Sequence, residues 1–203
     1  MVKVKICGIT KPEDAEYAIE LGADFVGVIV YPKSKRYVPH NIRKDILRAS
    51  EGAMRVAVMV NPTLDEALKI LEEGFDLVQL HGEESLELAS GVGKDRVIKA
   101  FRVKNEEPSI EKGWKACYAV LLDTFSEKAY GGTGKSFDWK LGRAVVEKGF
   151  KVFLSGGLTP SNVREAILKV RPFAVDVSSG VEKEPGIKDK MKVELFIEEA
   201  KAL

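Results

Sequence analysis

The hydrophobic pattern of the chain alternates between short apolar runs and longer segments with helical spacing. Strands that alternate with helices at this spacing indicate βαβ units and a parallel sheet. The apolar, β-branched runs that we expect to form strands are Val2–Ile6, Phe25–Val30, Arg55–Val60, Leu77–Leu80, Val97–Phe101, Ala119–Leu122, Val152–Leu154 and Ala174–Val177.

Several of the intervening segments carry helix start and stop signals. Thr10 and Glu13 have the spacing of a capping box, and Gly22 is placed to end that helix. The segment Lys104–Lys115 is the weakest helix candidate because it contains a proline and a glycine. The other clear helical segments are residues 61–71, 160–170 and 190–203.

Eight strand candidates in 203 residues predict a single-domain (β/α)₈ barrel over residues 1–203, at the low end of the usual size. An open doubly wound sheet has the same local pattern and is the main alternative. In a barrel, catalytic groups lie at the carboxyl ends of the strands. The unusual residues Cys7, Asp123 and the Ser-Gly stretches at 155–157 and 178–180 all occupy such positions.

The alternation of side chains across a strand predicts which residues point into the barrel. Val4 and Ile6 belong to an apolar face that should meet the helices, so Lys5 and Cys7 should point inward. The same argument places Asp176 inside. Because an unpaired buried charge is costly, we expect Lys5 to pair with a carboxylate, either Asp176 or Asp123.

Composition narrows the class of function. Lys and Arg number 32 against 31 for Asp and Glu, without a basic stripe, so no nucleic-acid partner is expected. The longest apolar run, Phe25–Val30, is too short to cross a bilayer, and the N-terminus lacks a secretion signal. We therefore expect a cytoplasmic protein, monomer or homodimer, that acts on a small molecule. A single glutamine beside abundant Lys and Glu favours a thermophilic source.

Two strand-end residues could move protons. Cys7 is followed by Gly8, which lets a ligand approach, although a free cysteine is more often a small buried hydrophobic residue. Asp123 follows an apolar strand, and its alternative role is to cap a loop. Cys117 lacks such a context, and we interpret it as structural.

Backbone N–H groups in small-residue loops after the last two strands commonly bind phosphate in barrels. Two ordinary turns are the alternative, but their matching positions favour the phosphate site. The candidate phosphate-binding residues are Gly156, Gly157, Ser178, Ser179 and Gly180.

Three further motifs bear on the site. Arg36 could bind a carboxylate through two hydrogen bonds, and His81 follows the strand Leu77–Leu80 at the same edge. The segment 129–136 resembles a nucleotide-binding P-loop but lacks its first glycine and its strand–helix context, so we interpret it as an active-site loop. His40 has no such context. The spacing of the histidines and Cys7 predicts no metal site.

Together these motifs resemble the phosphoribosylanthranilate isomerase family of tryptophan biosynthesis. The resemblance implies an Amadori rearrangement without a cofactor, with Cys7 as general base and Asp123 as general acid. It also implies Arg36 on the anthranilate carboxylate and the two Ser-Gly loops on the phosphate. From their positions at the active face and inside the barrel, His81 and Asp176 are further candidate substrate-binding residues. The matching stretches are residues 4–10, 31–37, 78–83, 121–123, 130–139, 154–158 and 175–182.

Two other functions compete with this interpretation. A sugar-phosphate isomerase of the histidine pathway would need two carboxylates as its acid and base and a second phosphate site. A non-catalytic sensor of phosphorylated ligands would keep the phosphate loops without needing Cys7 and Asp123 together.

Overall fold

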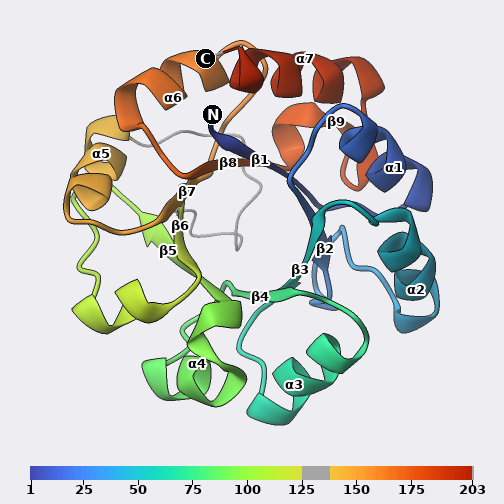
Figure 1. Cartoon of the computed structure of the whole chain (residues 1–203), viewed down its shortest axis with the longest axis horizontal. Coiled ribbons are helices and arrows are strands. Elements are labelled where there is room, and N and C mark those ends of the chain that lie inside the picture. Colours follow the sequence, from blue (N-terminus) through green and yellow to red (C-terminus); the bar gives the residue numbers. More distant parts are fainter. Residues whose placement is uncertain (125–137, 203) are drawn as a thin grey trace.

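A computed structural model describes residues 1–124 and 138–202 and shows a closed barrel of eight parallel strands (Figure 1). Strand β8 pairs back with β1, with Lys5 opposite Asp176. This closure confirms the predicted (β/α)₈ barrel and excludes the open sheet. The barrel strands are β1 (Lys3–Cys7), β2 (Phe25–Ile29), β3 (Met54–Met59), β4 (Leu77–Leu80), β5 (Val97–Val103), β6 (Ala119–Thr124), β7 (Val152–Leu154) and β8 (Ala174–Val177).

Helices form an outer ring around the strands (Figure 1). Residues 104–115, the weakest helix candidate, contain no α-helix, and a short 3₁₀ helix, η2 (Lys112–Ala116), stands between β5 and β6. There Trp114 packs edge-on against Phe101, with ring centroids 5.9 Å apart. The α-helices of the described residues are α1 (Pro12–Glu20), α2 (His40–Ala49), α3 (Leu64–Glu72), α4 (Leu86–Val92), α5 (Trp139–Glu147), α6 (Val163–Val170) and α7 (Lys190–Lys201).

The capping box predicted at Thr10 is wrong. Lys11 is the N-cap residue of α1 and makes no side-chain cap, because the Thr10 hydroxyl donates instead to the carbonyl of Gly186. A capping box does occur at α3, between Thr63 and Glu66, so this helix begins later than the predicted residue 61. A tertiary partner 176 positions away thus outcompetes the local cap at Thr10.

Strand alternation divides the core into two layers. An outer layer between strands and helices includes Val4, Ile6, Val175 and Val177, as predicted from parity. An inner layer fills the barrel, where Phe25 and Phe153 meet edge-on at a centroid distance of 5.1 Å. Toward the carboxyl ends of the strands the buried interior becomes polar. Its residues there include Lys5, Cys7, Gln79, His81, Asp123, Ser155 and Asp176.

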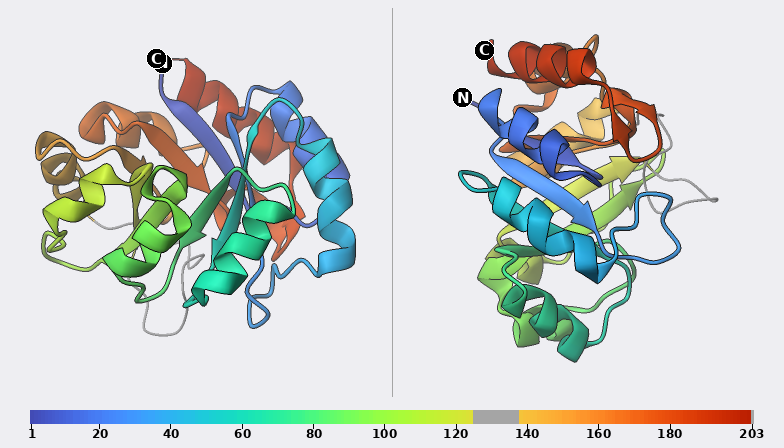
Figure 2. Two further views of the ribbon diagram at one scale, coloured as in Figure 1. Left: turned by 60° about the horizontal axis from the view of Figure 1, so that its bottom comes forward. Right: turned by 90° about the vertical axis from the view of Figure 1, so that its right-hand side faces the viewer.

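After β8 the chain makes the short helix η3 (Ser179–Val181) and a two-stranded hairpin, β9 (Glu182–Glu184) with β10 (Ile187–Lys188). Helix α7 then returns beside β1, and the two termini lie close together (Figure 2). Near these ends, the Asp24 carboxylate forms salt bridges with Lys3 Nζ at 2.7 Å and with Lys201 Nζ at 2.6 Å.

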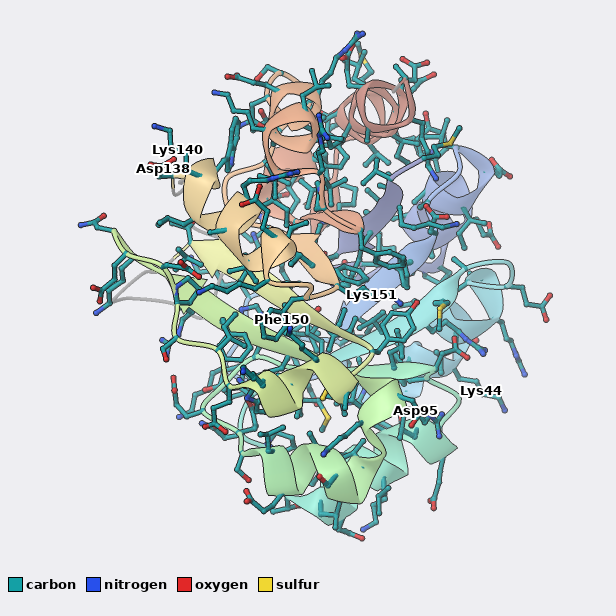
Figure 3. All side chains as sticks on the ribbon, turned by 60° about the vertical axis from the view of Figure 1, so that its left-hand side comes forward. Lys44, Asp95, Asp138, Lys140, Phe150 and Lys151 are labelled. Atoms are coloured by element: carbon teal, nitrogen blue, oxygen red, sulfur yellow. The ribbon has the colours of Figure 1, made fainter. Side chains whose placement is uncertain are left out.

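Charged side chains cover the outside of the helical ring. Lys44, Asp138 and Lys140 are exposed, whereas Phe150 is buried before β7 (Figure 3). In the part of the chain that the structure describes, no helix is both long and apolar enough to span a membrane.

Candidate active site

Cys7 is the last residue of β1, whereas the sequence pattern placed it directly after the strand. Its neighbour on β2 is Gly27. A Cβ atom added to Gly27 would lie 2.8 Å from Cys7 Sγ and 3.0 Å from Lys5 Nζ. The missing side chain of Gly27 therefore leaves room in which the thiol and a buried ammonium group come close.

Lys5 is completely buried and pairs with Asp176, one of the two carboxylates, Asp176 or Asp123, that the sequence predicted as its partner. Its Nζ donates to Asp176 Oδ1 at 2.8 Å, and Ser155 Oγ donates to Asp176 Oδ2 at 2.9 Å. Burial tends to lower the pKa of Lys5, but the attraction of Asp176 and Cys7 outweighs burial and raises it. Lys5 therefore stays protonated at neutral pH and places a positive charge beside Cys7.

The surroundings of the Cys7 thiol act on its pKa in opposite directions. Burial raises its pKa above the usual value, whereas Lys5 and Lys188 favour the thiolate and partly offset that effect. Lys188 comes from β10, is itself buried, and donates to the carbonyls of Cys7 and Ser178. A thiol in this setting is a strong base once it has lost its proton.

Asp123 lies inside β6, near its carboxyl end, and not after the strand as predicted. Its Oδ1 accepts a hydrogen bond from the backbone N–H of Thr124 at 2.8 Å, and its Oδ2 lies 3.4 Å from His81 Nε2. The other ring nitrogen of His81 lies 2.8 Å from Gln79 Nε2. The sequence reasoning missed Gln79, although a polar residue two positions before His81 in an apolar strand was the available signal.

Arg36 is held by Glu182, a residue that the sequence reasoning also missed. Arg36 Nε and Nη2 donate to the two carboxylate oxygens of Glu182 at 2.8 and 2.6 Å, and Lys188 Nζ donates to Glu182 Oε1 at 3.0 Å. Burial tends to raise the pKa of Glu182, but these two cations outweigh it and lower the pKa. The pairing fixes Arg36 through one edge of its guanidinium and leaves Nη1 outside that pair.

Arg36 also approaches the ends of β1 and β8. A Cβ atom on Gly8 would lie 2.8 Å from Arg36 Cδ and 2.7 Å from Ser178 Oγ. Gly8 has a φ angle of +74°, which favours glycine. Only a glycine therefore lets these two side chains come together beside Cys7.

The two predicted phosphate loops pack directly against each other. A Cβ atom on Gly180 would lie 1.9 Å from the carbonyl oxygen of Leu158. Gly156 and Gly157 both have positive φ angles, and Ser179 and Gly180 belong to η3. Within the described residues, Ser178 Oγ is buried without a hydrogen-bond partner, which suits an anion-binding position.

The other sequence predictions fall outside this site. Residues 129–136, predicted as an active-site loop, lie outside the described residues. His40 is exposed and contacts Glu73 at 3.2 Å, and Cys117 is buried in the outer core. The described residues contain no group of three His, Cys, Asp or Glu side chains arranged to hold a metal ion.

Known proteins resemble this chain over its whole length. The family model of N-(5'-phosphoribosyl)anthranilate (PRA) isomerase matches residues 4–199. The N-(5'-phosphoribosyl)anthranilate isomerase of Aquifex aeolicus is 56% identical over 204 residues, covering 100% of both chains. That of Thermotoga maritima is 47% identical over 209 residues, again covering 100% of both. The thermophilic character expected from composition fits these thermophilic relatives.

Solved structures agree with the sequence relatives. The crystal structure of phosphoribosylanthranilate isomerase from Thermotoga maritima superimposes with a TM-score of 0.89 at 42% identity over 100% of both chains. A phosphoribosylanthranilate isomerase in complex with reduced 1-(o-carboxyphenylamino)-1-deoxyribulose 5-phosphate gives a TM-score of 0.86 at 42% identity, again over 100% of both chains. Another structure contains monomers generated from the dimeric Thermotoga maritima protein, with a TM-score of 0.85, 42% identity and full coverage of both chains. The chain belongs to the phosphoribosylanthranilate isomerase family.

Proposed function

We propose that this isomerase of tryptophan biosynthesis converts N-(5'-phosphoribosyl)anthranilate to 1-(2-carboxyphenylamino)-1-deoxy-D-ribulose 5-phosphate, with Asp123 as general acid and Cys7 as general base. The observation that carries the proposal is the position of both groups in one polar layer at the carboxyl ends of a closed barrel's strands. The match to the family over residues 4–199 supports the same reaction.

Asp123 begins the reaction in its protonated form. It gives its proton to the ribose ring oxygen while the C1–O bond breaks, and the nitrogen lone pair forms the C1=N bond of an iminium. The carboxylate that results accepts from Thr124 N–H and faces His81 Nε2. These neighbours stabilise the charge that develops on Asp123 as the proton leaves.

Cys7 acts next as a thiolate. It removes the C2 proton, whose acidity the adjacent iminium has increased, and the C–H electron pair forms a C1=C2 bond while the iminium electrons return to nitrogen. The enolamine then tautomerises to the ketone, losing its C2 hydroxyl proton to water and gaining a proton at C1 from water. Asp123 takes up a proton and Cys7 releases one before the next turnover, so protons balance over the cycle, and no redox or electron-sink cofactor takes part. Each positioned proton-transfer group contributes about 10²–10⁴-fold.

The remaining side chains orient the substrate. Arg36, anchored by Glu182, binds the anthranilate carboxylate through its Nη1 edge. Gly156, Gly157, Ser178, Ser179 and Gly180 bind the phosphate, and Ser178 Oγ supplies a hydroxyl donor. His81 and Asp176 line the polar interior beside the sugar. The related isomerase solved with reduced 1-(o-carboxyphenylamino)-1-deoxyribulose 5-phosphate supports a ligand of this type.

The test is turnover of N-(5'-phosphoribosyl)anthranilate by the purified protein, followed as loss of anthranilate fluorescence. Cys7→Ala and Asp123→Asn should each lower kcat by about 10²-fold or more. Cys117→Ala is the matched control, because it removes a buried thiol from the outer core, away from the polar layer. Normal turnover by either of the first two variants would contradict the assigned roles.

The same assay separates the two competing functions. A sensor of phosphorylated ligands would bind the substrate without consuming it. A histidine-pathway isomerase would turn over its own substrate, phosphorylated at both ends, in preference to N-(5'-phosphoribosyl)anthranilate. We expect turnover of the anthranilate compound, because Cys7 stands where that other mechanism needs a second carboxylate.

A further inference from the structure

The side chain of Gln79 belongs to no step of the mechanism above, yet it is one of the most buried polar groups in the barrel. Gln79 is the only glutamine of the chain and is 1% exposed. It points into the barrel from β4 and lies against His81, which in turn reaches Asp123. Gln79, His81 and Asp123 therefore form a continuous row, which we call the Gln79 row.

The contact with Gln79 selects one form of the imidazole, and the ionised form of Asp123 favours the same one. Gln79 Nε2 carries only protons, so its 2.8 Å contact requires a lone pair on His81 Nδ1. At the other end, Asp123 Oδ2 lies 3.4 Å from His81 Nε2, and once Asp123 has given up its proton its carboxylate offers only acceptor oxygens there. Within the described residues, His81 Nε2 has no hydrogen-bond partner, so a neutral His81 with its single proton on Nε2 accepts from Gln79 and keeps an N–H available beside the ionised Asp123.

The alternative arrangement rotates the Gln79 amide by half a turn, and it leaves the more costly buried groups without partners. In the observed orientation, one amide N–H bonds His81 Nδ1, and Gln79 Oε1 is buried without a partner within the described residues. The rotated amide would use Oε1 and leave both of its N–H groups without partners in the same buried place. Because buried N–H groups without partners are rarer and more costly than under-used oxygens, the observed orientation is favoured.

We propose that Gln79 is a positioning residue for the general acid: it holds His81 as the Nε2–H tautomer, so that the imidazole donates toward Asp123. A neutral donor at this point stabilises the aspartate that remains after the proton has passed to the sugar. It does so without placing a second full charge beside the general acid. The catalytic part of this inference rests on the proposed role of Asp123, whereas the tautomer of His81 does not.

The chain is well suited to a direct measurement, because it contains only two histidines. In protein labelled with ¹⁵N at histidine, two-bond NMR correlations to the ring protons distinguish the Nε2–H tautomer, the Nδ1–H tautomer and the imidazolium. A His40→Asn variant removes the signal of the exposed histidine and assigns the remaining one to His81. We expect His81 in the wild-type protein to be the neutral Nε2–H tautomer near neutral pH.

Two substitutions at Gln79 test the cause. Gln79→Glu replaces the donor with an acceptor, so Nδ1 of His81 should gain a proton. Gln79→Met keeps the size and removes the hydrogen bond, so both neutral tautomers should appear, and this variant remains informative if the buried glutamate prevents folding. In the folded variants kcat should fall about tenfold or more, with KM changed much less, because a transition-state interaction is lost.

Each outcome decides the inference. A wild-type His81 in the Nδ1–H form, or a tautomer that both Gln79 variants leave unchanged, would overturn the role of Gln79. A changed tautomer with wild-type kcat would overturn its link to catalysis. Failure of the proposed function is seen separately, as full activity of Asp123→Asn, and leaves the NMR result valid.

Discussion

Removing the positive charge of Lys5 should strongly destabilise the barrel. In Lys5→Met, Asp176 stays buried with Ser155 as its remaining side-chain partner. Loss of one partner of a buried ion pair costs about 3–5 kcal/mol. For a chain of this size each kcal/mol corresponds to about 2–4 °C in Tm, so Tm should fall by roughly 6–20 °C.

Guanidinium chloride unfolding followed by circular dichroism measures this cost. The double variant Lys5→Met, Asp176→Asn is the matched control, because it removes both charges together and should recover part of the lost stability. A single variant within about 1 kcal/mol of the wild type would refute the argument that the pair is a buried, mutually dependent unit.

The pH dependence of the same measurement has a definite sign. The pKa of Lys5 is raised above 10.5 in the folded protein, so its contribution to stability is fully present below pH 10.5. The contribution is lost as the pH rises through the higher folded value. The difference in unfolding free energy between wild type and Lys5→Met should therefore stay constant at neutral pH and shrink only in strongly alkaline solution.

Two further substitutions test the binding loops. Gly180→Ala places a Cβ atom 1.9 Å from the Leu158 carbonyl oxygen, so the two phosphate loops must separate and KM should rise about tenfold or more. The control is Gly22→Ala, where a Cβ atom meets nothing within 4 Å but φ is +100°. It should lower stability and leave KM unchanged. Glu182→Gln removes the carboxylate that anchors Arg36 and should cost about 3 kcal/mol at neutral pH in urea unfolding. Because the pKa of Glu182 is lowered below 4.5, its stabilisation is present above that pH and disappears as the pH falls, so wild type and variant should converge in acid. An equal difference between them at neutral and acidic pH would contradict this linkage.

The sequence by itself determined the strands, the helical ring and the direction of the key side chains. Five of the eight strand candidates differ from the observed strands only at their ends, and the other three match. The inward positions of Lys5 and Asp176 followed from alternation alone, because the period of two in a strand is a local property of the backbone. The sequence also predicted that Lys5 pairs with a carboxylate, because an unpaired buried charge is costly, but it left Asp176 and Asp123 as alternatives.

Only the tertiary structure decided how the barrel closes and which polar groups meet inside it. The register that sets Lys5 against Asp176 joins residues 171 positions apart, and nothing local specifies that distance. The same holds for Glu182 behind Arg36, and for Thr10, whose hydroxyl prefers Gly186 to its own helix. Local spacing fixes where a side chain points, whereas its partner is fixed by the closed sheet, which brings distant strand ends into one desolvated space where every polar group must be satisfied.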